Sequence, residues 1–189
     1  MRMGKGRLEA FSDGVIAIII TIMVLELKVP HGEDWAAITP LWPKFLSYVV
    51  SFIIVGIYWN NHHHMMHSVQ RVSGAILWSN LHLLFWLSLL PFTSGWIGEN
   101  HFAAVPVAGY GVVLFMSAVA YFILVRAIIA AHGTDSEFAR RLGADWKGKV
   151  PLPAYALGIA LAFVNPWISM AIYAAIGALW FIPDRRFEK

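Results

Sequence analysis

The sequence predicts an all-α integral membrane protein with six transmembrane helices in a single domain of 189 residues. Hydrophobic residues make up 59% of the chain and charged residues 13%, whereas ordinary soluble domains contain about 25% charged residues. Apolar runs recur along the whole chain and are separated by polar or helix-breaking residues. Lysine and arginine fall almost entirely on one side of the six-span arrangement that these runs define.

A helix needs about 20 residues to cross the hydrocarbon core of a bilayer, and this length identifies the expected spans. They lie near residues 10–29, 43–66, 72–97, 103–131, 150–165 and 166–182, so residues 1–189 form one transmembrane domain. The last two runs are short and are separated by Asn165-Pro166, which favours a turn and therefore a tight helical hairpin. The polar stretch from Ala131 to Lys149 predicts a surface loop or a short interfacial helix.

The basic residues predict an orientation with the N- and C-termini in the cytoplasm. In that orientation the outer side carries two basic residues, Lys28 and Lys44, and the inner side carries twelve. The twelve are Arg2, Lys5, Arg7, Arg71, Arg126, Arg140, Arg141, Lys147, Lys149, Arg185, Arg186 and Lys189. This positive-inside bias favours an even number of spans. Indole rings prefer the membrane interface, and four fall at the expected outer ends: Trp35, Trp42, Trp96 and Trp167.

Several classes of function are disfavoured by the composition. The chain has no cysteine, which excludes disulfides, thiolate metal sites and a cysteine nucleophile. The net charge of +3 comes from basic residues scattered between apolar runs, so no nucleic-acid partner is expected. Without a nucleotide-binding glycine loop or a Gly-x-Ser-x-Gly elbow, neither an enzyme nor a cofactor is predicted. A cleaved signal peptide is disfavoured because no small-x-small cleavage site follows Leu25.

The head of the first apolar run places acids at the entry to a membrane helix. An ionisable group costs about 2.5–3.5 kcal/mol at the centre of such a helix, and less near its ends. Glu9 and Asp13 are four residues apart, so two like charges share one helical face. Arg7 lies about 240° around the helix from Asp13 and does not face it. We therefore expect Asp13 to find a partner on another segment.

Histidines at the end of the second run are the expected source of that partner. Residues 60–67 read Asn-Asn-His-His-His-Met-Met-His, and neutral imidazole is the commonest metal ligand. On a helix His63 and His67 share a face, whereas His62 points elsewhere. The cluster contains no acid or cysteine, and no second histidine box follows. We expect one or two of these side chains to hydrogen-bond near Asp13, with metal binding as the disfavoured alternative.

The third run carries further polar groups within its apolar sequence. Trp78, His82 and Trp86 recur at intervals of four, and Asn80 lies beside them. His82 would lie about 15 Å into the helix, so we expect it to face the bundle rather than lipid. It could tie helices together by a hydrogen bond or act as a proton-sensitive group.

One string in the fourth run, Val107-Ala108-Gly109-Tyr110-Gly111, is similar to the Thr-Val-Gly-Tyr-Gly filter of potassium channels. A re-entrant filter needs a pore helix before it and an inner helix after it, but the run from Phe102 to Val125 is long enough for only one span. We therefore expect Gly109 and Tyr110 to allow close helix packing instead.

Along the first helix, Ile18, Ile22 and Leu25 form one apolar stripe with Thr21 beside it. Spacing alone favours a lipid-facing or core stripe.

A resemblance to a known family adds to these interpretations. The first helix contains Arg7-x-x-x-Phe11-Ser12-Asp13, then Ala17-Ile18-x-x-Thr21 and Leu25-x-Leu27, and it resembles the first-helix signature of the transmembrane protein 175 family. This family comprises a lysosomal potassium channel and its bacterial single-repeat relatives. Ser51-Phe52 with Trp59-x-x-His62-His63 resembles the second helix of the family, and Asn80-Leu81 with Leu90-Pro91-Phe92 resembles its third. The similarity covers about the first half of the chain.

The resemblance implies a potassium-preferring cation channel that lacks a carbonyl filter. One six-helix repeat per chain implies a homotetramer in the inner membrane of a prokaryote, passing potassium and other monovalent cations. The first helix would line the pore, with the constriction at Ile18 and further apolar layers at Ile22 and Leu25. Thr21 would form a polar ring. Arg7, Phe11, Ser12 and Asp13 would anchor the helices around the cytoplasmic mouth, with His62, His63, Asn80 and His82 as candidate hydrogen-bond partners.

Two other functions remain open from the residues alone. A proton-coupled secondary transporter could use Asp13, His82 and the histidines of residues 62–67 as a relay, although the spans show no evident inverted repeat. A histidine-ligated metalloenzyme or metal sensor is weakened by the missing second histidine box.

Overall fold

The computed structural model describes residues 4–142 and 146–181, and the regular structure within them is helical. The α-helices are α1 (Lys5–Met23), α2 (Trp42–His67), α3 (Gly74–Ser88), α4 (Leu90–Glu99), α5 (Ala104–His132), α6 (Glu137–Leu142), α7 (Trp146–Lys149), α8 (Pro151–Leu161) and α9 (Pro166–Phe181). Three short 3-10 turns, η1 (Val24–Glu26), η2 (Trp35–Ala37) and η3 (Thr39–Leu41), lie between α1 and α2.

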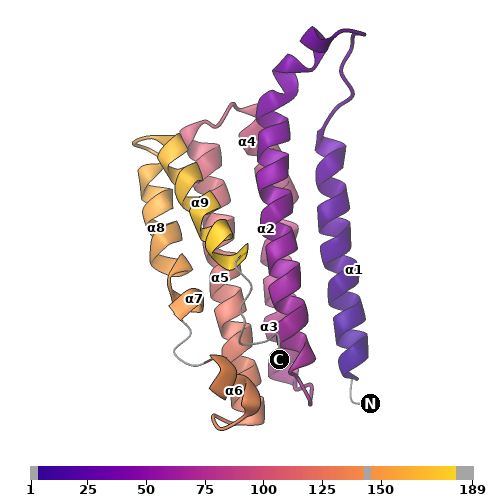
Figure 1. The fold of residues 1–189 in the computed structure, drawn as a ribbon, viewed down its shortest axis with the longest axis vertical. Helices are drawn as coiled ribbons and strands as arrows, with labels where there is room; N and C mark the ends of the chain where they lie inside the picture. The colour runs from indigo at the N-terminus through magenta and orange to yellow at the C-terminus, as the bar shows by residue number, and fades with distance from the viewer. Residues whose placement is uncertain (1–3, 143–145, 182–189) are drawn as a thin grey trace.

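The long helices stand side by side in one bundle, with α1 at its edge (Figure 1). Helix α5 packs against α3, α4, α8 and α9, whereas α1 packs against α2, α3 and α4. Four helical stretches in the described residues are long and apolar enough to cross a membrane, and they cover Lys5–Glu26, Trp35–His67, Gly74–Glu99 and Ala104–His132. The α8–α9 hairpin is apolar, but each of its helices is shorter than these stretches.

The third expected span is broken into two helices. Helix α3 ends at Ser88 and α4 begins at Leu90, so Leu89 separates them. The cause is Pro91, which has no backbone N–H and whose ring crowds the carbonyl one turn earlier. Beyond the break, α4 packs against α1, α2 and α5.

Other boundaries differ from the expected ranges by short distances. The first helix begins at Lys5 rather than near residue 10, and its last turn tightens into η1. The polar stretch after α5 contains the short helices α6 and α7. Helix α8 ends at Leu161 and α9 begins at Pro166, so the chain turns at the Asn-Pro pair, where the Asn165 side chain accepts a hydrogen bond from the Trp167 amide at 2.9 Å.

A chain of buried hydroxyl groups ties three helices together. The Tyr110 hydroxyl on α5 lies 2.9 Å from Ser51 Oγ on α2. Ser51 Oγ in turn donates to Ser94 Oγ on α4 at 3.0 Å, and Ser94 Oγ donates to the Ser47 carbonyl at 3.1 Å. Because Ser51 uses its one proton on Ser94, Tyr110 must donate to Ser51. Each hydroxyl therefore has a partner within the protein.

The filter-like string of residues 107–111 lies inside the continuous helix α5, so its backbone is helical and forms no re-entrant loop. Its glycines serve packing. A side chain at Gly111 would overlap the Tyr173 hydroxyl from α9, and one at Gly158 on α8 would collide with the same ring. Glycine at these two positions lets α9 approach α5 and α8 closely.

We predict that Gly111→Ala lowers the stability of the bundle. The added methyl group meets the Tyr173 ring in a fully buried position, and overpacking of this kind costs about 1–3 kcal/mol. Thermal unfolding in detergent should show a lower midpoint for this variant. Gly56→Ala is the matched control, because an added Cβ there meets nothing within 4 Å. Equal midpoints for the two variants would contradict the packing role of Gly111.

Candidate functional site

Helix α1 has one packed face and one open face. The packed face consists of Leu8, Ser12, Ile16, Ile19 and Met23, which are all buried against the rest of the chain. The spacing of three and four residues gives a single stripe along the helix. The other residues of α1 are half-buried or exposed, so one side of this long apolar helix at the edge of the bundle is uncovered (Figure 1).

The sequence-predicted stripe lies on the open face. The side chains of Ile18, Ile22 and Leu25 are 57%, 43% and 75% exposed. Thr21 lies among them and is also exposed, and its hydroxyl donates back to the carbonyls of Ala17 and Ile18 at 3.0 Å. Since the hydroxyl proton is used within the helix, the oxygen lone pairs of Thr21 remain available on the open face.

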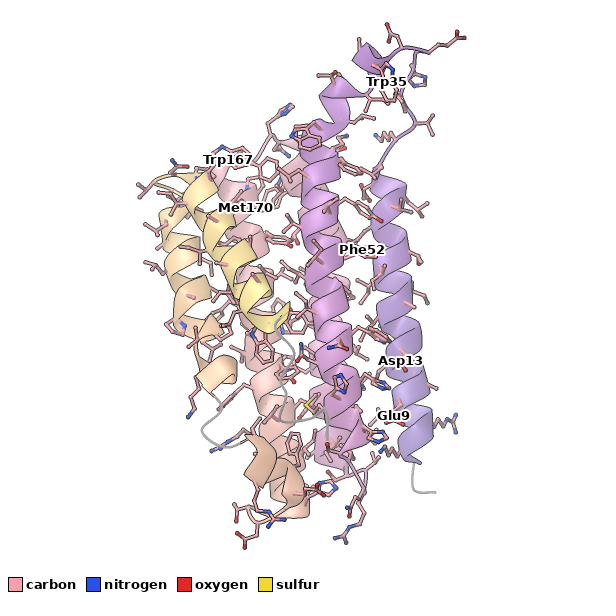
Figure 2. All side chains as sticks on the ribbon, viewed as in Figure 1. Glu9, Asp13, Trp35, Phe52, Trp167 and Met170 are labelled. Atoms are coloured by element: carbon pink, nitrogen blue, oxygen red, sulfur yellow. The ribbon has the colours of Figure 1, made fainter. Side chains whose placement is uncertain are left out.

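Asp13 is held by α2. Its Oδ1 atom accepts a hydrogen bond from Trp59 Nε1 at 3.1 Å. Figure 2 shows Glu9 and Asp13 on the side of α1 that faces α2. The expected partner from another segment is therefore present, but it is an indole and not one of the histidines that follow it. An indole N–H does not titrate, so the donor in this hydrogen bond is the same at every pH.

Ser12, the neighbour of Asp13 in the motif, belongs to a second buried link. Asn80 Nδ2 on α3 donates to Ser12 Oγ at 2.9 Å, and Asn80 Oδ1 lies 2.7 Å from His62 Nε2 on α2. Ser12 Oγ donates to the Leu8 carbonyl at 2.9 Å. Asn80 thus has both ends of its amide satisfied, because His62 Nε2 donates to its oxygen. All three side chains are buried, and the link joins α1, α2 and α3.

The remaining motif residues, Arg7 and Phe11, have exposed side chains, and Phe11 is 50% exposed. Within one chain the motif therefore binds its neighbours through Ser12 and Asp13. Before the motif, Lys5 lies 3.8 Å from Glu9 and also donates to the carbonyl of His67 at the end of α2. This pair supplies Glu9 with a cation on its own helix.

The other predicted polar residues, His63 and His82, make different contacts. The His63 ring contacts the rings of Trp59 and His64 at the surface of α2. His82 is half-buried and accepts from Trp86 Nε1 at 2.9 Å within its own helix, so it ties no helices together through this bond. Among the described residues, no group of three His, Cys, Asp or Glu side chains is placed to hold a metal ion.

Two contacts were not predicted from the sequence. Trp59 was not identified as the donor to Asp13, although the motif-like spacing Trp59-x-x-His62-His63 places it one turn before the histidines. The links made by Ser51, Ser94 and Tyr110 were also missed. The sequence does contain an indication of these links, because hydroxyl side chains within apolar membrane helices often form hydrogen bonds between helices.

Comparisons with known proteins agree on one family. A family model described as "Endosomal/lysosomal potassium channel TMEM175" matches residues 7–91. A potassium channel of Chryseobacterium sp. (strain P1-3) is 56% identical over 99% of this chain and 97% of its own length. A potassium channel of Streptomyces collinus is 32% identical, with 94% and 91% covered. The crystal structure of a lysosomal potassium-selective channel TMEM175 homolog from Chamaesiphon minutus matches with a TM-score of 0.82 and 28% identity, covering 95% of this chain and 97% of that one.

We predict that Asn80→Ala destabilises the packing of α1. The change removes two hydrogen bonds and leaves Ser12 and His62 without their shared partner. Hydrogen bonds between membrane helices average about 0.6 kcal/mol and reach about 1.7, so the loss should be about 1–3 kcal/mol. Thermal unfolding in detergent measures it. Asn60→Ala, at an exposed position of α2, is the control and should change little. A variant at position 80 as stable as that control would argue against the link.

Proposed function

The chain belongs to the TMEM175 family of channels, and on that premise we propose that four copies form a potassium-preferring cation channel whose pore is lined by α1. Each subunit crosses the inner membrane of a prokaryote six times, with both termini in the cytoplasm and the α8–α9 hairpin supplying the last two spans. The names of the two bacterial relatives and of the matched crystal structure support a potassium channel.

The observation that carries this proposal is the division of α1 into two faces. One face is held by buried apolar contacts and by the Ser12 and Asp13 bonds, whereas Ile18, Ile22 and Leu25 lie on the other. A helix that lines a pore between subunits needs this arrangement, because one face must be fixed and the other must face the axis. The anchor residues lie at the cytoplasmic end, away from the stripe.

The apolar stripe of Ile18, Ile22 and Leu25 gives the pore a physical means of closing. From Ile18 to Leu25 the helix rises by about 10 Å, so four copies form three apolar layers of that total depth. Such a constriction can close sterically or by expelling water, and a small rotation or splay of α1 would open it. Potassium preference then comes from the width of the pore, the Thr21 oxygens and the field at the mouths, without a ring of backbone carbonyls.

Exposed aromatic side chains on both flanks of α1 support a ring of subunits. On α2, Phe45, Phe52 and Trp59 are 44–46% exposed. On α3 and α4, Trp78, Phe85 and Phe92 are 54–75% exposed. In a closed ring, one flank of each subunit meets the opposite flank of the next, which is a heterologous contact. The same contact would cover Phe11, whose side chain is half-exposed in one chain.

The alternative of a proton-coupled transporter is less well supported. It needs a relay from Asp13 through the histidines of α2 to His82. Instead, Asp13 bonds Trp59, His62 bonds Asn80, and His82 bonds Trp86 within α3. These three hydrogen bonds do not join into one path.

We predict that Ile18→Ala increases potassium current in planar bilayers containing the purified protein. The shorter side chain widens the narrowest apolar layer and lets water enter it. Unitary currents and open probability are the quantities to measure. Ile123→Ala is the matched control, because Ile123 is a similarly exposed isoleucine on α5 and should leave the current unchanged. Saturable, coupled flux without unitary currents would overturn the channel assignment and favour the transporter.

We also predict four chains per particle. Native mass spectrometry of the detergent-solubilised protein, together with amine crosslinking in membranes before extraction, measures this number directly. A monomer in both experiments would contradict a pore that is built between subunits, whereas four chains in both would agree with it.

A further inference from the structure

Helix α5 ends in a histidine whose ring is bonded on both sides. His132 Nδ1 lies 2.9 Å from the carbonyl oxygen of Ile128 in the preceding turn. Its Nε2 accepts hydrogen bonds from two backbone amides, those of Gln70 at 3.0 Å and Arg71 at 3.1 Å. The side chain is half-buried, at the end of the bundle that also carries the start of α1 (Figure 1).

These contacts define the protonation state of the ring. A carbonyl oxygen can only accept, so Nδ1 must carry a proton. The two amides can only donate, so Nε2 must present its lone pair. The arrangement therefore requires the neutral Nδ1–H tautomer. A proton added at Nε2 would place a third N–H group against the two amide donors and would remove their acceptor.

The segment that His132 holds is the connection between α2 and α3, residues 68–73. The amides of Ser68 and Val69 bond back to α2, at the carbonyls of Met65 and Met66. The amides of Gln70 and Arg71 donate to His132 instead. Immediately before the segment, the carbonyl of His67 accepts from the Lys5 side chain of α1. The connection is thus fastened to α5 through an imidazole and to α1 through an ammonium group.

We propose that His132 is a pH-sensitive latch that fastens the α2–α3 connection to α5 and releases it when the ring is protonated. The latch is closed where the imidazole is neutral, and acidification opens it. Histidine side chains commonly change charge between about pH 5 and about pH 8, and this general range sets the two pH values of the test below. When the latch opens, the connection and the adjoining end of α2, which Lys5 contacts, are no longer fastened to α5.

The segments at this end of the bundle carry charged and titratable groups. Within the described residues they include His67 and Arg71 beside the connection, Lys5 on α1, Asp135 in the turn after α5, and Glu137 and Arg140 on α6. They are of both signs. The side chains of Arg71, Asp135, Glu137 and Arg140 are exposed, where solvent and salt screen their fields. The hydrogen-bond geometry at the ring therefore determines the sign of the response.

The effect on conduction rests on the proposed function. If α1 lines the pore, a connection fastened to both α1 and α5 limits how far the cytoplasmic end of α1 can move. Acidification on the side of His132 should then change the open probability, and this dependence should weaken when residue 132 cannot titrate.

Amide hydrogen exchange and nitrogen NMR on the wild-type protein test the latch itself. Exchange of a peptide spanning residues 67–74, corrected for the intrinsic effect of pH, should be roughly five- to thirty-fold faster at about pH 5.5 than at about pH 8, as expected for the loss of one or two ordinary hydrogen bonds. Solid-state NMR of histidine-labelled protein in liposomes, with the His132 signal identified by its loss in His132→Gln, should show the Nδ1–H tautomer for His132 at about pH 8. Equal corrected exchange at both values, or an Nε2–H ring at position 132, would overturn the proposal.

Variants separate titration from structure. His132→Gln offers an amide oxygen near the position of Nε2 that does not titrate, so exchange should stay slow at both pH values. His132→Ala should exchange fast at both. His101→Gln, at the other end of the bundle, is the control and should keep the wild-type pH dependence. A pH dependence that survives in His132→Gln would overturn the proposal.

The exchange and NMR measurements need no ion current. A protein that conducts no potassium but shows the pH-dependent exchange keeps the latch and loses the channel assignment. A conducting protein with pH-independent exchange keeps the channel and loses the latch.

Discussion

A polar side chain placed in hydrocarbon must find its partner within the protein, and this constraint determines how α1 is held. The head of the helix brings a serine and an aspartate into the bundle. Asn80 and Trp59 are the groups that satisfy them, from α3 and α2 respectively. Because the two bonds run from adjacent positions of α1 to different helices, they orient the helix as well as attach it. Everything proposed for the opposite face depends on that orientation.

The bonds made by Ser12 and Asp13 determine which face of α1 stays open. With Ser12 turned inward, residues Ile16, Ile19 and Met23 continue the packed stripe, and the open face carries Ile18, Ile22 and Leu25. A purely apolar helix could rotate among similar packings at little cost. A buried serine and asparagine resist that rotation, since turning the helix would leave both without partners. The apolar side chains that would form the gate are therefore positioned by polar groups more than a turn away.

The sequence predicted the helical bundle well because apolar length and helix-breaking pairs are local signals. The need of Asp13 for a distant partner was predictable for the same reason. The identity of that partner was not, because Trp59 counts as apolar in pattern reasoning although its indole carries a donor. The pairing of His62 with Asn80 depends on the relative heights of α2 and α3, which spacing within one helix does not specify. Pro91 indicates that the helix is interrupted nearby, but the exact position of the break at Leu89 is evident only from the packed structure.

In the proposed channel α1 turns one face to the protein and the other to the ion path. Single cysteines along α1 test it most directly, because the chain has no native cysteine. Each variant is exposed to a water-soluble thiol reagent while current is recorded in a bilayer. We expect that modification of a cysteine at 18, 21, 22 or 25 blocks the current, and that a cysteine at 16, 19 or 23 gives no block. Block at the second set, or none at the first, would contradict it.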